Sequence, residues 1–173
     1  MYLEYWGLKV SPFENLPNPD FLYFSSKHEE ALTRLVYAAQ GRKGAAMLTG
    51  DPGMGKTTLT RAFIRQLDEK RYDIGLVANP SLEPVDFIKE ILYQLDVQSD
   101  STSKVDLLRL LNEKMLSNIQ KDMDTIVIVD EAQAIENEKT LEELRMLLNF
   151  QMNDRFLLTL ILVGQPELQA KVE

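Results

Sequence analysis

The sequence LTGDPGMGKTTLTRAF, between Leu48 and Phe63, contains residues that are suited to binding phosphate. Its glycines, lysine and threonine satisfy G-x-x-x-x-G-K-[ST], the P-loop pattern. Glycine lets backbone N–H groups turn toward an anion without a clash from a Cβ atom, and the helix that follows adds the positive end of its dipole. An ordinary glycine turn is the alternative, but the pattern favours nucleotide binding. The expected nucleotide contacts are Gly50, Asp51, Pro52, Gly53, Met54, Gly55, Lys56, Thr57 and Thr58.

Four residues have specific predicted roles in ATP chemistry. Lys56 carries an ammonium that reaches the β- and γ-phosphates, and the Thr57 hydroxyl binds Mg²⁺. Asp130 and Glu131 directly follow the apolar run TIVIV. A carboxylate at the end of a strand beside a P-loop holds Mg²⁺ or its waters, which we predict for Asp130. The next carboxylate, Glu131, is predicted to orient and deprotonate the attacking water.

The acid pair has a simpler alternative, a solvated strand end of the kind found on many surfaces. Its place after a buried run and downstream of a P-loop favours catalysis. The N-K-x-D motif that reads guanine is absent from the sequence, so we predict ATP rather than GTP. The expected cofactors are therefore ATP and Mg²⁺, and the expected activity is ATP hydrolysis.

Two further polar residues follow apolar runs. Gln165, after LILVG, is a candidate sensor that hydrogen-bonds the γ-phosphate or the attacking water; its alternative role is a helix cap before Pro166. Asn79 is a candidate partner that holds the Glu131 carboxylate until a signal releases it. A turn residue before a proline is an equally good interpretation of Asn79. His28, the only histidine, is expected to be a surface residue rather than a catalyst.

The elements that must position these residues follow from the hydrophobic pattern. Apolar runs predict strands at 44–50, 72–80, 125–131 and 156–165. Helical spacing predicts helices at 26–40, 56–70, 83–95, 103–119 and 139–153. Because the strands do not alternate with polar residues, they are expected to be parallel and covered on both faces, in a doubly wound α/β sheet. Ligands of such sheets bind outside the carboxyl ends of the strands, where the candidate residues lie.

Bulk composition limits the class of protein. The chain has 173 residues with 45% hydrophobic residues, typical of a soluble globular protein and enough for a single domain. We expect residues 1–40 to form an arm and a first helix that pack on a core of residues 41–173. The net charge of −8 disfavours a dedicated nucleic-acid binder, although a local basic patch remains compatible with it. No apolar run approaches the ~20 residues that span a bilayer, and cysteine is absent.

The opening MYLEYWGLKVSPFENLPNPDFLYFSSKHEEAL resembles the start of the ExeA/GspA family, general secretion pathway protein A and its relatives. The segments GDPGMGKTTL, IVDEAQ and LLNFQMNDRFLLTLILVGQPEL resemble the Walker A, Walker B and sensor-1 regions of that family, in the same order. The resemblance implies an AAA+ ATPase of the P-loop NTPase fold. It assigns Lys56 and Thr57 to nucleotide and Mg²⁺, Asp130 and Glu131 to hydrolysis, and Gln165 to sensing.

The resemblance also implies partners and a place in the cell. Members of the family serve assembly of envelope systems such as type II secretion, pili or exopolysaccharide export, so envelope proteins and copies of the chain itself are expected partners. The family continues beyond the GQPEL segment with a helical lid and an arginine finger, and many members have a later membrane span. We therefore expect a cytoplasmic ATPase core, truncated after sensor 1 and tethered through a later region, that binds ATP but hydrolyses it weakly alone.

Two other functions stay open at the level of sequence. A DNA-associated AAA+ ATPase, such as a transposition regulator, has a similar core and would show DNA-stimulated hydrolysis. A nucleotide-dependent scaffold would use ATP to control association with little turnover.

Overall fold

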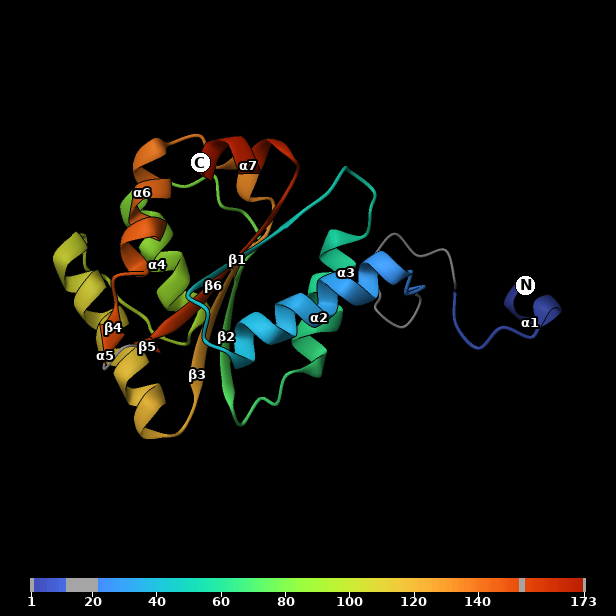
Figure 1. Ribbon diagram of the computed structural model, residues 1–173, viewed down its shortest axis with the longest axis horizontal. Helices are drawn as coiled ribbons and strands as arrows, with labels where there is room; N and C mark the ends of the chain where they lie inside the picture. The colour runs from blue at the N-terminus through green and yellow to red at the C-terminus, as the bar shows by residue number, and fades with distance from the viewer. Residues whose placement is uncertain (1, 12–21, 153–154, 173) are drawn as a thin grey trace.

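The computed structural model describes residues 2–11, 22–152 and 155–172, and its centre is a four-stranded parallel sheet (Figure 1). The strands are β1 (Ala45–Thr49), β2 (Tyr72–Val77), β3 (Asp124–Val129) and β6 (Leu158–Gly164). Their order across the sheet is β1-β6-β3-β2, with parallel pairing throughout. The predicted α/β P-loop class is confirmed, and all four carboxyl ends meet at one edge of the sheet.

Helices cover both faces of this sheet (Figure 1). On one face lie α2 (Ser26–Gln40) and α3 (Lys56–Gln66), and on the other lie α4 (Pro84–Gln94), α5 (Lys104–Gln120) and α6 (Glu138–Leu147). Alternate residues of each central strand point to opposite faces. Ile126 and Ile128 of β3 therefore pack with α2 and α3, whereas Val127 and Val129 pack in the other cluster. The strands are apolar without a break because both of their faces are buried.

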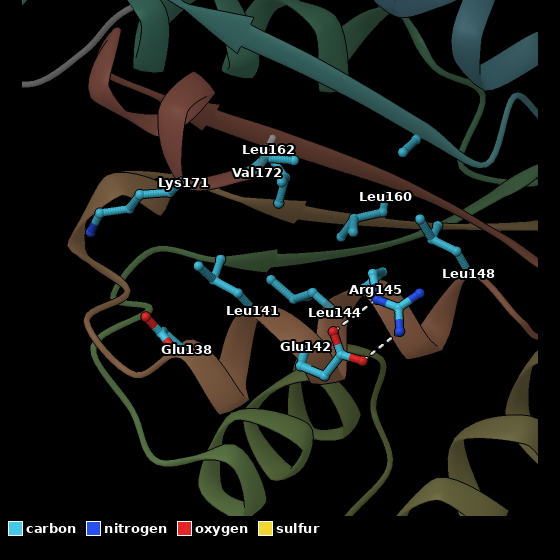
Figure 2. A pocket seen from close by; sticks show the side chains of 11 residues that line it. Glu138, Leu141, Glu142, Leu144, Arg145, Leu148, Leu160, Leu162, Lys171 and Val172 are labelled. Carbon is cyan, nitrogen blue, oxygen red and sulfur yellow. Dashed lines mark hydrogen bonds and ion pairs between the residues drawn. The ribbon is translucent and has the colours of Figure 1, made fainter.

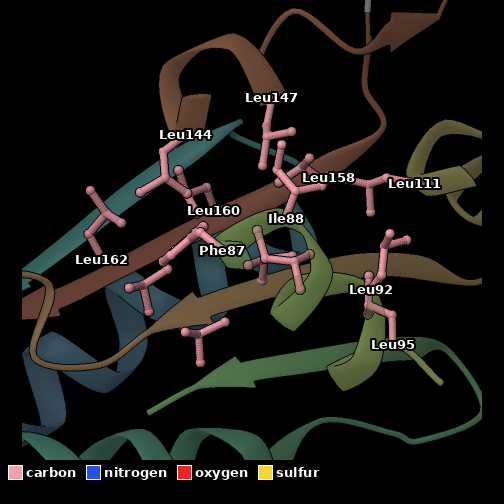
Figure 3. Packing of buried hydrophobic residues seen from close by; sticks show 14 of the residues in the cluster. Phe87, Ile88, Leu92, Leu95, Leu111, Leu144, Leu147, Leu158, Leu160 and Leu162 are labelled. Carbon is pink, nitrogen blue, oxygen red and sulfur yellow. The ribbon is translucent and has the colours of Figure 1, made fainter. Parts of the chain in front are cut away.

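The larger cluster lies on the side of α4, α5 and α6 (Figure 3). Phe87 and Ile88 of α4 are fully buried, and they pack with Leu158 and Leu160 of β6 and Leu111 of α5. Burying a side chain of this size contributes about 1.5–3 kcal/mol. This packing fixes the central strands, and it thereby fixes the loops at their carboxyl ends.

The strand β1 departs from the expectation that every strand is covered on both faces. Its residues alternate between exposed and half-buried, whereas every residue of β6 is buried. The reason is position, because β1 pairs only with β6 and forms one edge of the described sheet. The apolar run alone does not distinguish an edge strand from a central strand.

The segment before β6 also differs from the expectation. The helix predicted at 139–153 ends at Leu147, and a short hairpin follows, formed by β4 (Gln151–Met152) and β5 (Arg155–Phe156). The Leu157 N–H donates to the Phe150 carbonyl at 2.9 Å, which closes the hairpin. A 3-10 turn η2 (Ala132–Ala134) and a helix α7 (Glu167–Val172), which were not predicted, follow β3 and β6.

The N-terminal arm was expected to pack on the core. Instead, α1 (Tyr2–Trp6) forms a short helix that buries none of its residues and lies apart from the sheet in Figure 1. Tyr5 and Trp6 contact each other edge to face and are 79% and 70% exposed. In contrast, α2 packs on the sheet through Leu32 and Leu35. The arm's proline-rich part, with Phe13, lies outside the described residues.

No helix in the ranges that the structure describes is both long and apolar enough to cross a membrane.

Candidate functional site

The predicted phosphate-binding loop, residues 50–55, lies between β1 and α3, at the carboxyl edge of the sheet. Gly53 and Gly55 have φ angles of 80° and 78°, in the left-handed region that side chains with a Cβ rarely adopt. Gly55 is the N-cap of α3, so the loop enters the helix directly. The Gly50 N–H donates to the Gly164 carbonyl at 3.2 Å, which joins the loop to the end of β6. The first-turn amides of a helix lack intrahelical partners, so they are free to bind an anion.

The Lys56 ammonium is held close to this loop. Its Nζ donates to the carbonyl oxygens of Gly50 at 2.8 Å and Asp51 at 3.1 Å. The side chain therefore folds back along the loop, and its positive charge lies beside Gly50 and Asp51. A bound phosphate would offer that ammonium charged acceptors in place of these neutral carbonyls, which adds the attraction between two opposite charges.

The loop and the acid pair meet through Thr57 and Asp130. The Thr57 Oγ1 donates to the Asp130 Oδ2 at 2.9 Å, although the two residues are 73 positions apart. The Asp130 side chain is nearly buried, with 7% of the residue exposed, and its Oδ1 accepts the Glu131 N–H at 2.9 Å. A hydroxyl and a carboxylate oxygen at this separation fit a Mg²⁺ ion.

In the ranges that the structure describes, no group of three or more histidine, cysteine, aspartate or glutamate side chains could hold a metal ion. That result is compatible with Mg²⁺ at a nucleotide, because Mg²⁺ keeps several waters and takes one or two protein ligands together with phosphates.

Glu131 lies beside this pair but has a different partner from the one expected. Its side chain is exposed, and its backbone has φ 51° and ψ 36°, in the left-handed region. One carboxylate oxygen accepts a hydrogen bond from the Gln133 Nε2. The expected contact with Asn79 is not found among the hydrogen bonds of the described residues, and Asn79 is exposed after β2. Gln133 is closer along the chain, and the turn η2 brings its amide back toward Glu131.

Gln165 lies next to the same cluster. It follows β6, is half-buried, and its backbone N–H donates to the Gln133 Oε1 at 3.0 Å. The Gln165 carbonyl accepts the Leu168 N–H at 3.0 Å, which starts α7. The backbone of Gln165 therefore starts the helix, and this is compatible with a sensor role for its side chain.

Two residues near the site were not singled out from the sequence in this role. Gln133 joins the ends of β3 and β6, and the only signal for it is a polar residue shortly after the acid pair. His28, expected to be a surface residue, is half-buried, and its Nε2 lies 3.0 Å from the Met54 carbonyl oxygen. Its Nδ1 lies 2.9 Å from the Ser25 Oγ, the N-cap of α2. The contact with Ser25 is local, between the N-cap and the first turn of α2, whereas the contact with Met54 does not follow from sequence spacing because the two residues are 26 positions apart.

An apolar hollow of about 410 Å³ lies away from this loop, between α6, α7 and the edge of the sheet (Figure 2). Leu141, Leu144 and Leu160 point into it, and Glu142 and Arg145 pair at its rim. The hydrogen bond from Arg145 lowers the pKa of the Glu142 carboxyl. Its walls are mostly apolar, and the Lys171 Nζ at its edge donates to the Gln133 and Ile135 carbonyl oxygens, so the hollow is less suited to phosphate than the loop before α3.

Comparisons with known proteins agree with the fold and with the loop. A family model described as AAA domain matches residues 39–172. General secretion pathway protein A of Aeromonas hydrophila is 39% identical over 171 residues, which cover 98% of this chain and 31% of that protein. The chain thus spans about a third of the length of this relative.

Solved structures show the same fold at low identity. The ORC2 protein of Aeropyrum pernix superposes with a TM-score of 0.62 at 17% identity, covering 94% of this chain and 49% of that chain. Cdc6p from Pyrobaculum aerophilum superposes with a TM-score of 0.60 at 19% identity, covering 90% and 46%. The family match covers most of the chain. The chain therefore belongs to the AAA domain family, as a nucleotide-binding AAA ATPase domain related to general secretion pathway protein A.

Proposed function

We propose that this chain binds Mg-ATP at the loop between β1 and α3 and hydrolyses it to ADP and phosphate. The observation that carries the proposal is the 2.9 Å hydrogen bond between Thr57 and Asp130. This bond brings Asp130, with Glu131 next to it in the chain, beside the loop, and it supports one site that combines anion-binding amides, a cation and two carboxylates.

Each residue has a role that its position supports. Lys56 exchanges the carbonyl oxygens of its own loop for β- and γ-phosphate oxygens, and the backbone N–H groups of residues 53 and 55–57 bind the remaining oxygens. Thr57 and Asp130 hold Mg²⁺, which neutralises phosphate charge. Glu131 accepts a proton from the water that attacks the γ-phosphorus, while the bond to the β–γ bridging oxygen breaks. Gln165 is proposed to contact the γ-phosphate or the attacking water, and Asn79 stays a candidate for holding the Glu131 carboxylate until a signal releases it.

The wider function is proposed from the similarity to general secretion pathway protein A, which covers nearly all of this chain. We infer that ATP binding and hydrolysis here drive assembly of an envelope system from the cytoplasmic side, with self-association of the chain and contacts with envelope proteins. The net charge of −8 supports protein partners over nucleic acid.

Calorimetric titration with ATP and Mg²⁺ tests the proposal. The wild-type chain should release binding heat, and Lys56→Ala should weaken binding by at least about 100-fold because the phosphates lose a charge-assisted partner. Lys139→Ala, which removes an exposed lysine of α6, is the matched control and should bind as the wild type does. Chelating Mg²⁺ with EDTA should weaken ATP binding in both the wild type and the control.

The outcomes separate the candidate functions. Absence of binding heat in folded wild-type protein would overturn the proposal. Hydrolysis that DNA stimulates would favour a DNA-associated ATPase, and binding without any hydrolysis would favour a nucleotide-controlled scaffold.

A further inference from the structure

Gln133 lies at the meeting point of three elements around the proposed catalytic carboxylate. Its Nε2 donates to the Glu131 carboxylate and its Oε1 accepts the Gln165 N–H at 3.0 Å. Its backbone carbonyl accepts from the Lys171 Nζ of α7 at 2.6 Å. One side chain therefore joins the end of β3 to the end of β6, and its backbone joins both to α7.

The direction of these hydrogen bonds is fixed by chemistry. A carboxylate only accepts and a backbone N–H only donates, so the two ends of a primary amide satisfy both partners at once. A glutamate at this position would accept from the Gln165 N–H but would repel Glu131. A leucine of similar size would satisfy neither.

The backbone of Glu131 shows that its position depends on such support. A left-handed conformation is uncommon for a residue with a Cβ and costs on the order of 1–2 kcal/mol. A residue stays in this conformation only when its surroundings hold it there. The contacts that hold it are the Asp130 Oδ1, which accepts the Glu131 N–H, and the Gln133 amide, which binds the carboxylate.

The other side of the contact requires a glycine. A Cβ built on Gly164 would lie 2.7 Å from the Gln133 Oε1 and 2.9 Å from the Leu168 Cδ2, both far inside contact distance. Gly164 is also the residue whose carbonyl accepts the Gly50 N–H of the phosphate loop. The amide of Gln133 therefore occupies space that any larger residue at position 164 would fill.

From these contacts we propose that Gln133 is a positioning residue that fixes the Glu131 carboxylate to the β6–α7 loop, so that Glu131 and Gln165 are placed as one unit. The inference rests on the proposed function, because it assigns the unit to water activation. It also predicts that a shift of α7 or of the Gln165 loop changes the position of Glu131 and thereby the rate of hydrolysis, with little effect on ATP affinity.

Three variants test the unit. Gln133→Glu keeps the acceptor for the Gln165 N–H and removes the donor to Glu131, whereas Gln133→Leu removes both. Gly164→Ala adds a methyl group that displaces the side-chain amide of Gln133. Gln40→Glu, an exposed position at the end of α2, matches the charge change of the first variant and serves as control.

Three measurements are made on each chain. The first is single-turnover hydrolysis of γ-labelled ATP with protein in excess, and the second is ATP affinity by calorimetry. The third is hydrogen exchange at the Gln165 amide without nucleotide. We expect hydrolysis to fall at least about 10-fold in the three site variants, with ATP affinity within about twofold of wild type, because general-base catalysis depends on geometry. The Gln165 amide should exchange faster in Gln133→Leu and keep its protection in Gln133→Glu.

The results distinguish the inference from the proposed function. Wild-type protein that neither binds nor hydrolyses ATP would overturn both. Normal or faster hydrolysis in folded Gln133→Glu, with a functional wild type, would overturn the inference alone, and so would unchanged exchange at Gln165 in Gln133→Leu. If the leucine variant does not fold, Gln133→Glu and Gly164→Ala still decide the question.

Discussion

Polar side chains lie at both ends of the parallel sheet, but their exposure and their hydrogen-bond partners differ. At the carboxyl end, Lys56 bonds to loop carbonyls and Glu131 is exposed. At the amino end, polar side chains satisfy one another inside the fold. Asn118 of α5 is 2% exposed, and its Nδ2 donates to the Asp73 Oδ2 at 2.7 Å and to the Thr125 Oγ1 at 2.9 Å.

The supporting elements explain this difference. Asp73 lies in β2 and also pairs with Lys114 of α5 at 3.0 Å, so one helix and two strands supply the partners of this buried cluster. Loops and the first turn of a helix supply the partners at the other end. A change at the amino end should therefore alter the free energy of unfolding, and a change at the carboxyl end should alter nucleotide chemistry. Each prediction below tests this separation.

Glu131→Gln should have the largest effect. Loss of the carboxylate removes the proposed proton acceptor, so single-turnover hydrolysis should fall on the order of 10²–10⁴-fold, with ATP affinity retained. The free energy of unfolding should stay within about 0.5 kcal/mol, because the side chain is exposed. Glu136→Gln, an exposed glutamate five positions later, is the control. A large decrease in the free energy of unfolding of Glu131→Gln would contradict the separation of stability from nucleotide chemistry between the two ends.

Asn118→Ala should show the reverse pattern. The substitution leaves Asp73 and Thr125 without a buried amide donor, which costs about 1–3 kcal/mol. Denaturant unfolding measures that loss, and ATP affinity of the folded variant should equal that of the wild type. Asn149→Ala, at an exposed position, should change neither quantity. Weakened ATP binding in folded Asn118→Ala would show that the two ends are coupled.

His28→Ala should reduce ATP affinity by a few-fold. The ring contacts the Met54 carbonyl of the phosphate loop at 3.0 Å, and a hydrogen bond of this kind contributes about 1 kcal/mol. Alanine retains the backbone N–H that donates to the Ser25 cap, so α2 should remain intact. Equal ATP affinity in calorimetry would mean that the loop does not depend on this contact.

Arg42→Ala should have the smallest effect. Its Nε donates to the Asp124 Oδ1 at 2.7 Å at the amino end, but the Arg42 side chain is 33% exposed. Such a pair contributes about 0.2–1 kcal/mol and is screened by salt. Unfolding at low and high ionic strength should show a loss that shrinks as salt rises. A loss that salt does not change would indicate packing of the arginine stem instead.

The chemistry of the phosphate loop could be predicted because it depends on local residue order. The loop needs glycines, a lysine and a threonine at fixed spacing before a helix, and neighbouring residues supply all of them. The hairpin before β6 could not be predicted in this way. The helical spacing of leucines continues past the end of α6, through Leu141, Leu144 and Leu148. The hairpin instead depends on the backbone hydrogen bond from the Leu157 N–H to the Phe150 carbonyl, which joins residues on either side of it.

The partner of Glu131 illustrates the same limit at the site. Asn79 follows β2 and was predicted to hold the Glu131 carboxylate, but the turn η2 brings the Gln133 amide to that carboxylate. Pairings between loops depend on the direction in which each chain segment leaves its strand, and hydrophobic periodicity carries no information about that direction.

The order of residues was enough to predict the fold class and the glycine turn before α3, because hydrophobic periodicity and short-range spacing encode them, whereas the catalytic roles of Asp130 and Glu131 are proposals. The tertiary structure alone decided that β1 lies at an open edge, that His28 contacts the phosphate loop, and that Gln133 links Glu131 to Gln165. The physical reason is that these features join residues far apart in the chain, and only the packing of helices on both faces of the sheet brings them within hydrogen-bond distance.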